Sequence, residues 1–99
     1  MTKSLIKEQT AEMIERGAHL IPSYMWGGVK RYMVDRIPPG DFLTALFSND
    51  LMEAFGRADD ENQSNMRRYC QFLYNYAPRG SYGSPENVRA WLKGESNDG

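Results

Sequence analysis

The stretch from Ile37 to Asn62 carries the turn and capping residues that most constrain how this chain folds. The Pro-Pro-Gly run at 38–40 cannot continue a helix, because proline lacks a backbone N–H and glycine loses the most conformational entropy on ordering. Asp41 then begins a new apolar-striped segment, and Asp50 with Glu53 has the spacing of a capping box at the start of the next one. The stretch predicts a compact helical corner and specifies no chemistry.

The rest of the chain also consists of short segments with helical periodicity, separated by glycine and proline. We expect helices at approximately 5–16, 22–36, 41–47, 51–56, 61–76 and 85–93. No segment has the alternation of a strand. The sequence therefore predicts an all-α fold, a compact single domain of five or six short helices. Residues 1–20 form an N-terminal helix that we expect to be loosely docked, 21–94 the helical core domain, and 95–99 a flexible tail.

Two local patterns predict packing. In the longest expected helix, the three-four spacing of apolar side chains predicts a buried stripe, in which Cys70 is an inert buried thiol. The stripe consists of Met66, Tyr69, Cys70, Leu73, Tyr74 and Ala77. The Gly27-Gly28 pair lies inside an otherwise apolar helix, where each glycine costs about 1 kcal/mol against alanine. We favour close helix packing at this pair over a ligand surface.

Composition limits the classes of function. A chain of 99 residues with 40% hydrophobic and 25% charged side chains supports one folded domain with a modest core. Lys and Arg total 12 against 13 Asp and Glu, so the chain lacks the basic excess of most nucleic-acid binders and the acidic excess of a DNA mimic. The closely spaced acids from Asp50 to Glu61 are better explained as helix caps than as a general acid–base pair.

The single cysteine, Cys70, and the single histidine, His19, argue against an intramolecular disulfide, a zinc site and a cysteine–histidine catalytic pair. The apolar runs are far shorter than the roughly 20 residues of a membrane span. The N-terminal segment carries charges where a signal peptide has an apolar core. We therefore predict a cytosolic, non-enzymatic protein with no catalytic residue, no metal and no cofactor.

Arginines interleaved with aromatic residues are the best candidates for a binding surface. Arginine pairs with carboxylate or phosphate, aromatic rings stack on bases, and both types anchor protein interfaces. We assign ligand- or partner-binding roles to Arg31, Tyr32, Arg57, Arg79, Tyr82 and Trp91. Arg79 and Tyr82 lie on a glycine-containing loop that could shape a phosphate or nucleobase pocket. The alternative is that the aromatics complete a small core while the arginines pair with the capping acids.

The central segment also carries a recognisable pattern, with IPPGDFLTALFSNDLMEAFGRADDEN followed later by GSPENVRAWL. It matches IPPG…FLxAxxSNDLxEAxGRADxxN…GSPExVxxW, and over about residues 21–93 the chain resembles a family of small proteins encoded by bacteriophages and prophages. Arg36 stands where that pattern has a glycine, and residues 1–20 lie outside it. The family has no settled activity, so the resemblance transfers no site residue and implies only a phage accessory protein in the host cytoplasm.

Two classes of binding function follow as hypotheses. The first is a non-enzymatic phage protein that inhibits or sequesters a host defence component, either a host protein complex or a signalling nucleotide, through a surface that a homo-oligomer could complete. A nucleotide favours a closed pocket lined by arginine, whereas a protein favours a flatter apolar patch with a polar rim. The alternative is a small nucleic-acid-binding transcriptional regulator, whose affinity would fall steeply with salt.

Overall fold

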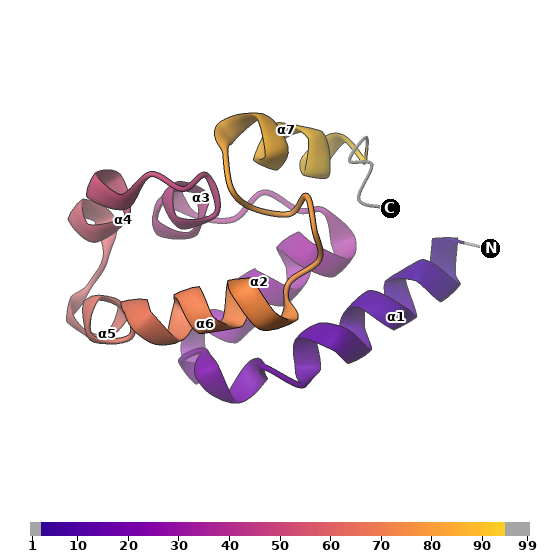
Figure 1. The fold of residues 1–99 in the computed structure, drawn as a ribbon, viewed down its shortest axis with the longest axis horizontal. Helices are drawn as coiled ribbons and strands as arrows, with labels where there is room; N and C mark the ends of the chain where they lie inside the picture. The colour runs from indigo at the N-terminus through magenta and orange to yellow at the C-terminus, as the bar shows by residue number, and fades with distance from the viewer. Residues whose placement is uncertain (1–2, 95–99) are drawn as a thin grey trace.

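The computed structural model of the chain describes residues 3–94, and every regular element in that range is helical. The elements are α1 (Lys3–Glu15), the 3₁₀ helix η1 (Ala18–Leu20), α2 (Ser23–Asp35), α3 (Asp41–Phe47), α4 (Leu51–Arg57), α5 (Asp60–Ser64), α6 (Met66–Tyr76) and α7 (Pro85–Lys93). The predicted all-α fold is confirmed. The helices α1, α2 and α6 lie on one side of the molecule and α7 on the other, with α3 and α4 closing one end (Figure 1).

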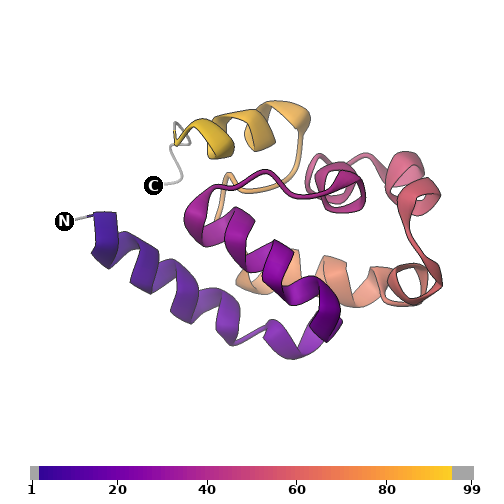
Figure 2. The ribbon, with the colours of Figure 1, turned by 180° about the vertical axis from the view of Figure 1, so that it is seen from behind.

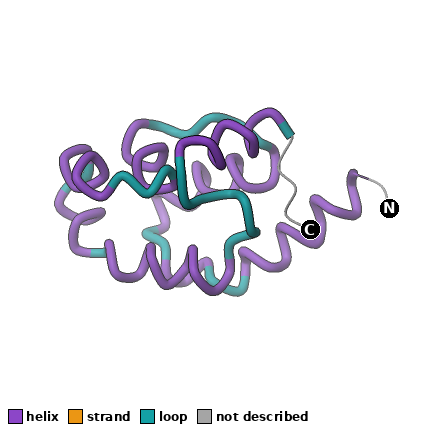
Figure 3. The backbone as a smooth tube through the Cα atoms, turned by 45° about the horizontal axis from the view of Figure 1, so that its top comes forward, coloured by secondary structure: helices purple, strands orange, loops and turns teal. Residues whose placement is uncertain are grey.

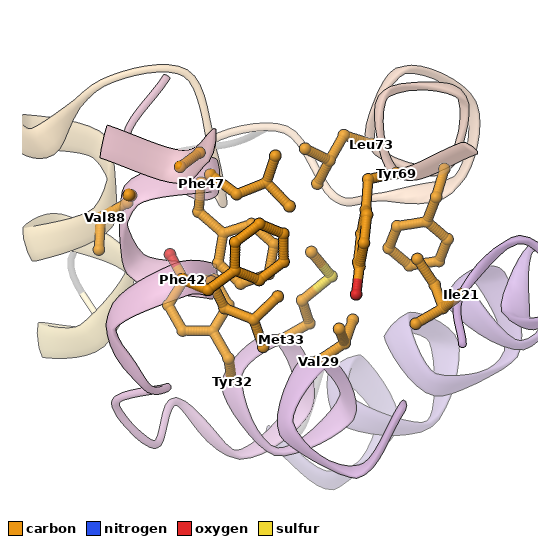
Figure 4. Packing of buried hydrophobic residues seen from close by; sticks show 14 of the residues in the cluster. Ile21, Val29, Tyr32, Met33, Phe42, Phe47, Tyr69, Leu73 and Val88 are labelled. Carbon is orange, nitrogen blue, oxygen red and sulfur yellow. The ribbon is translucent and has the colours of Figure 1, made fainter. Parts of the chain in front are cut away.

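The core lies between α2, α3 and α6 and is rich in aromatic rings (Figure 4). The rings of Tyr32 and Phe47 stack with centroids 4.7 Å apart, and Phe42 meets Tyr69 edge-on at 5.3 Å. Val88 extends this core onto α7. Such ring pairs contribute about 0.5–1.5 kcal/mol each beyond the area they bury.

The longest expected helix is two helices. The Asp59 carboxylate caps α5 by accepting a 2.7 Å hydrogen bond from the Asn62 N–H. The side chains of Ser64 and Asn65 then donate hydrogen bonds to backbone carbonyl oxygens of α5. These bonds compete with the backbone ladder, and α5 ends there. The described residues therefore form seven α-helices, one more than the six expected segments.

The capping residues of α4 and α7 are of the types that favour helix ends. Asp50 accepts from the Glu53 N–H at 3.2 Å, and Ser84 accepts from the Asn87 N–H at 3.0 Å at the start of α7. Gly94 ends α7 with φ 74°, a left-handed conformation that suits glycine. Only half of the predicted capping box forms, because the Glu53 side chain accepts from Arg57 instead of from the Asp50 N–H.

The N-terminal helix α1 lies alongside α2, and its first turns extend away from the body (Figures 2 and 3). Its C-terminal end is firmly packed, since Ile14 is fully buried and Gly17 lies against the rings of Phe72 and Tyr76. The first turns contribute an exposed ion pair between Lys7 and Asp35 at 3.5 Å. Exposed pairs of this kind are worth little. The expected tail at 95–99 lies outside the described residues.

Arg36, the residue that departs from the phage pattern, adopts the conformation for which a glycine is preferred. It ends α2 with φ 61° and ψ 39°, in the left-handed region. Its guanidinium lies 3.7 Å from the centroid of the Trp91 ring, and its Nη1 donates to the Trp91 carbonyl oxygen at 2.9 Å. These contacts offset the backbone cost and tie the end of α2 to α7.

The glycine pair in α2 supports the packing interpretation at one of its two positions. A Cβ on Gly28 would lie 3.3 Å from Leu43 of α3, so the missing side chain lets the two helices approach. Gly27 instead faces the guanidinium of Arg31, which folds back over its own helix.

Candidate functional site

Two of the six predicted binding residues lie in the core. Tyr32 is fully buried, and its hydroxyl donates to the Ser81 carbonyl oxygen at 2.7 Å. Trp91 is 1% exposed, and its Nε1 donates to the Tyr32 carbonyl oxygen at 3.1 Å. Burial raises the pKa of the Tyr32 hydroxyl. The expectation that Tyr32 is exposed beside Arg31 is therefore wrong, because its ring fills the core while its hydroxyl bonds the 77–84 loop.

The predicted arginines do not converge on one pocket. Arg31 is exposed and lies against Gly27, and Arg79 is exposed on the loop after α6. Arg57 is also exposed, but its guanidinium meets Glu53 at 2.8 Å and Asp41 at 3.3 Å. The hydrogen bond that Arg57 donates to Glu53, followed by the charges of both acids, raises the pKa of Arg57. The two main hollows of the described residues are open, and Arg57 is the one predicted arginine that lines either of them.

An apolar groove with a volume of about 250 Å³ lies between α4 and α6. Leu51 and Ala54 of α4 form one wall of the groove, and Cys70 and Tyr74 of α6 form the other. The end of α3 and the 82–83 loop supply further lining residues. Gly83 donates its N–H to the Phe47 carbonyl oxygen at 2.7 Å, which anchors that loop to α3. The groove is lined by Leu46, Asn49, Asp50, Leu51, Ala54, Met66, Cys70, Leu73, Tyr74, Tyr82 and Gly83. Of the six predicted binding residues, only Tyr82 is among them.

The two helices that border this groove carry large exposed apolar side chains. On α4, Leu51 is 63% exposed, Met52 84% and Phe55 41%; on α6, Tyr74 is 85% exposed, and Cys70 is also exposed. Leu51 and Phe55 are one helical turn apart and so share one side of α4. We name the groove together with these five side chains the α4–α6 face.

Sequence reasoning missed this face because it placed Cys70 and Tyr74 inside the core. That placement is wrong for both residues. Phe72 takes their place in the core: it is 1% exposed and meets Trp26 of α2 edge-on at 5.9 Å. Tyr76 follows Phe72 by one turn, and its ring lies over Gly17. The signal that could have located the face was the cluster of apolar residues on the short helix α4, which is more than a seven-residue helix needs for the core.

A second hollow, of about 270 Å³, adjoins the groove and is polar. Asp50 borders both hollows, while Asp41, Glu53 and Arg57 belong to the second alone. Within the described residues, no group of three or more histidine, cysteine, aspartate or glutamate side chains is arranged to hold a metal ion.

Perturbed titratable groups lie away from the groove. Tyr24 donates its hydroxyl to Asp59 Oδ2 at 2.6 Å, which lowers the pKa of Asp59 and, as the largest of several causes, raises the pKa of Tyr24 to about 12. Burial raises the pKa of Tyr69, whose hydroxyl donates to the Asn62 side chain at 2.6 Å. These groups connect α2, α5 and α6, and they stabilise the fold rather than form a reactive centre.

Comparison with protein-family models, curated proteins and solved structures finds no match for this chain. The resemblance to phage-encoded proteins therefore stays a prediction from the sequence pattern. None of the helices between residues 3 and 94 has the length and apolar character that crossing a bilayer requires.

Proposed function

We propose that this chain is a non-enzymatic bacteriophage accessory protein that inhibits a host defence protein by binding it through the α4–α6 face. One observation carries the proposal: an open apolar groove between two helices that both carry large exposed apolar side chains. Soluble monomers seldom expose contiguous apolar patches of this kind unless the patch binds something. Methionine and aromatic side chains are also the types enriched at protein interfaces.

The lining of the groove favours a protein over a nucleotide. A signalling nucleotide carries phosphates, which need arginine, lysine or backbone N–H groups around them. The only charged side chain that lines the groove is Asp50, a carboxylate, which repels phosphate. The volume of about 250 Å³ is also below the range of about 300–1,000 Å³ that is usual for small-molecule pockets. One or two apolar side chains of a protein partner fit it better.

No observation favours the nucleic-acid regulator. In the α3–α4 corner, α4 would be the recognition helix, yet its exposed residues include Met52, Phe55 and Glu53. Its one arginine, Arg57, is already paired with two carboxylates. An acidic and apolar helix surface is unfavourable beside phosphate.

The test is quantitative capture of host proteins by affinity-tagged chain, followed by binding and inhibition assays with the purified partner. We expect Met52→Glu and Tyr74→Glu each to abolish binding, because a charge would be buried at the contact. Ile37→Glu is the matched control, since Ile37 is 45% exposed outside the face, and it should bind as the wild type does. Native mass spectrometry that finds a bound nucleotide, or a partner that binds all three variants equally, would overturn the proposal.

A further inference from the structure

We infer that, when no target is bound, the α4–α6 face is covered by a second copy of this chain in a two-fold symmetric dimer. The inference rests on the proposed function in one respect, because it assigns a resting state to the surface that binds the target. The dimer itself is a property of the free protein and is tested without any target.

The exposed apolar area suits self-pairing. Leu51, Met52, Phe55 and Tyr74 together expose on the order of 500 Å², if each side chain has about 150–250 Å² when fully exposed. A stable interface buries about 800 Å² on each partner. The four side chains thus supply more than half of that area, and the groove walls and polar rim next to them supply the remainder.

The rim of the face is charged in a self-complementary way. Asp50 lies at the start of α4, on one wall of the groove. Arg67 lies one turn before Cys70 on α6 and two turns before Tyr74, so it shares their side of the helix, beyond the residues that line the groove. Both side chains are exposed, and neither forms an ion pair with another described residue.

Two-fold symmetry uses this arrangement twice. In such an interface, each contact occurs twice. If residue i of the first copy contacts residue j of the second, then residue j of the first copy also contacts residue i of the second. Placing α4 of one copy against α6 of the other brings Asp50 opposite the partner's Arg67 on both sides of the axis. The same pairing brings the exposed Tyr74 ring of each copy toward the groove of the other. The formal net charge of −1 means that no long-range repulsion opposes the association.

Sedimentation equilibrium over a range of concentrations tests the dimer. We expect the wild-type chain to sediment as a reversible dimer, and Met52→Glu and Tyr74→Glu to weaken the dimer about 30-fold or more, as loss of an interface anchor does. Ile37→Glu, the control outside the face, should dimerise like the wild type. A wild-type chain that stays monomeric at millimolar concentration, or a dimer that both face variants leave intact, would overturn the inference.

The charge pairs are tested by a double-mutant comparison that preserves the helix cap. Asp50→Asn keeps a side chain that can cap α4, and Arg67→Gln keeps much of the side-chain length. Because both copies carry the substitution, each single variant already removes both Asp50–Arg67 pairs. The dissociation constant of the double variant should therefore be no higher than that of either single variant. Effects of the two substitutions that simply add would show that these residues do not face each other. Far-ultraviolet circular dichroism confirms that each variant is folded.

Cys70 provides a reporter that needs no substitution. It is the only cysteine of the chain, it is exposed, and it lines the groove. We expect its reaction with a maleimide to slow as protein concentration rises through the dimerisation range, and to be independent of concentration in Tyr74→Glu. A concentration-independent wild-type rate would contradict the proposed interface. A dimer that forms as described while target capture fails would refute the proposed function alone, and the reverse result would refute the dimer alone.

Discussion

Gly17→Ala tests how tightly the N-terminal helix is joined to the core. Gly17 has φ −102°, which alanine adopts without strain, so any effect of the substitution comes from its methyl group. That methyl would lie 2.6 Å from Cγ of Tyr76 and 2.9 Å from Cδ1 of Phe72. Tyr76 is half-buried and can shift, whereas Phe72 is 1% exposed and cannot. Overpacking of this kind costs about 1–3 kcal/mol.

The expected net loss for Gly17→Ala is about 1–2 kcal/mol, because the lower entropy of the unfolded alanine chain returns about 0.4–1 kcal/mol. In a domain of this size, that loss lowers the Tm by roughly 5–15 °C. Gly56→Ala is the matched control, since it lies within α4 and its new methyl would have no atom within 4 Å. It should raise stability by up to about 1 kcal/mol, the helix preference of alanine over glycine.

Urea denaturation followed by circular dichroism measures both variants, with an unchanged m-value as the condition for comparing them. If Gly17→Ala were as stable as the wild type while Gly56→Ala behaved as expected, the turn between α1 and η1 would not be packed on α6 as described.

Three further predictions concern single contacts. Tyr32→Phe should lower the free energy of unfolding by about 1–2 kcal/mol, because a buried carbonyl loses its donor, whereas Tyr74→Phe should have no effect; thermal denaturation of both variants decides. Arg36→Gly should destabilise by about 1 kcal/mol despite relieving the left-handed backbone, because it removes the contact with the Trp91 ring and a charged hydrogen bond; an increase in Tm would contradict this. Hydrogen bonds hold the pKa of Asp59 below its ordinary 3.8, so the stability that it contributes is present above about pH 4 and is lost as the pH falls through the lower folded value. Asp59→Asn should therefore flatten the acid limb of the stability profile, and an unchanged limb would refute this role.

Local chemistry predicted the helix boundaries better than it predicted which side of each helix is buried. Asp50, Ser84 and Gly94 act within one turn of themselves, so their roles follow from the sequence alone. The break at Ser64 and Asn65 was harder to predict, since it depends on side chains that compete with the backbone for carbonyl groups inside an otherwise helical run.

The orientation of α6 was predicted only in part, because its sequence carries two overlapping apolar stripes. Met66, Tyr69 and Leu73 are buried as expected, whereas Cys70 and Tyr74 are exposed. One stripe contains Cys70 and Tyr74, and the other contains Phe72 and Tyr76. Both have helical spacing, and a periodic pattern alone does not rank them. Which stripe is buried depends on a contact between segments far apart in the sequence. Gly17 packs against Phe72 and Tyr76, and this contact covers the second stripe.

The orientation of α6 also explains why the proposed binding surface differs from the one that the sequence suggested. Tyrosine and tryptophan serve cores and interfaces alike, and composition cannot separate the two uses. In this fold Tyr32 and Trp91 satisfy their polar groups inside the molecule, so they contribute rigidity. Turning α6 toward η1 leaves Tyr74 in solvent next to the apolar side chains of α4. Stability alone gives no reason to keep an 85% exposed tyrosine on α6 and an 84% exposed methionine on α4, and the partner coverage proposed above would supply one.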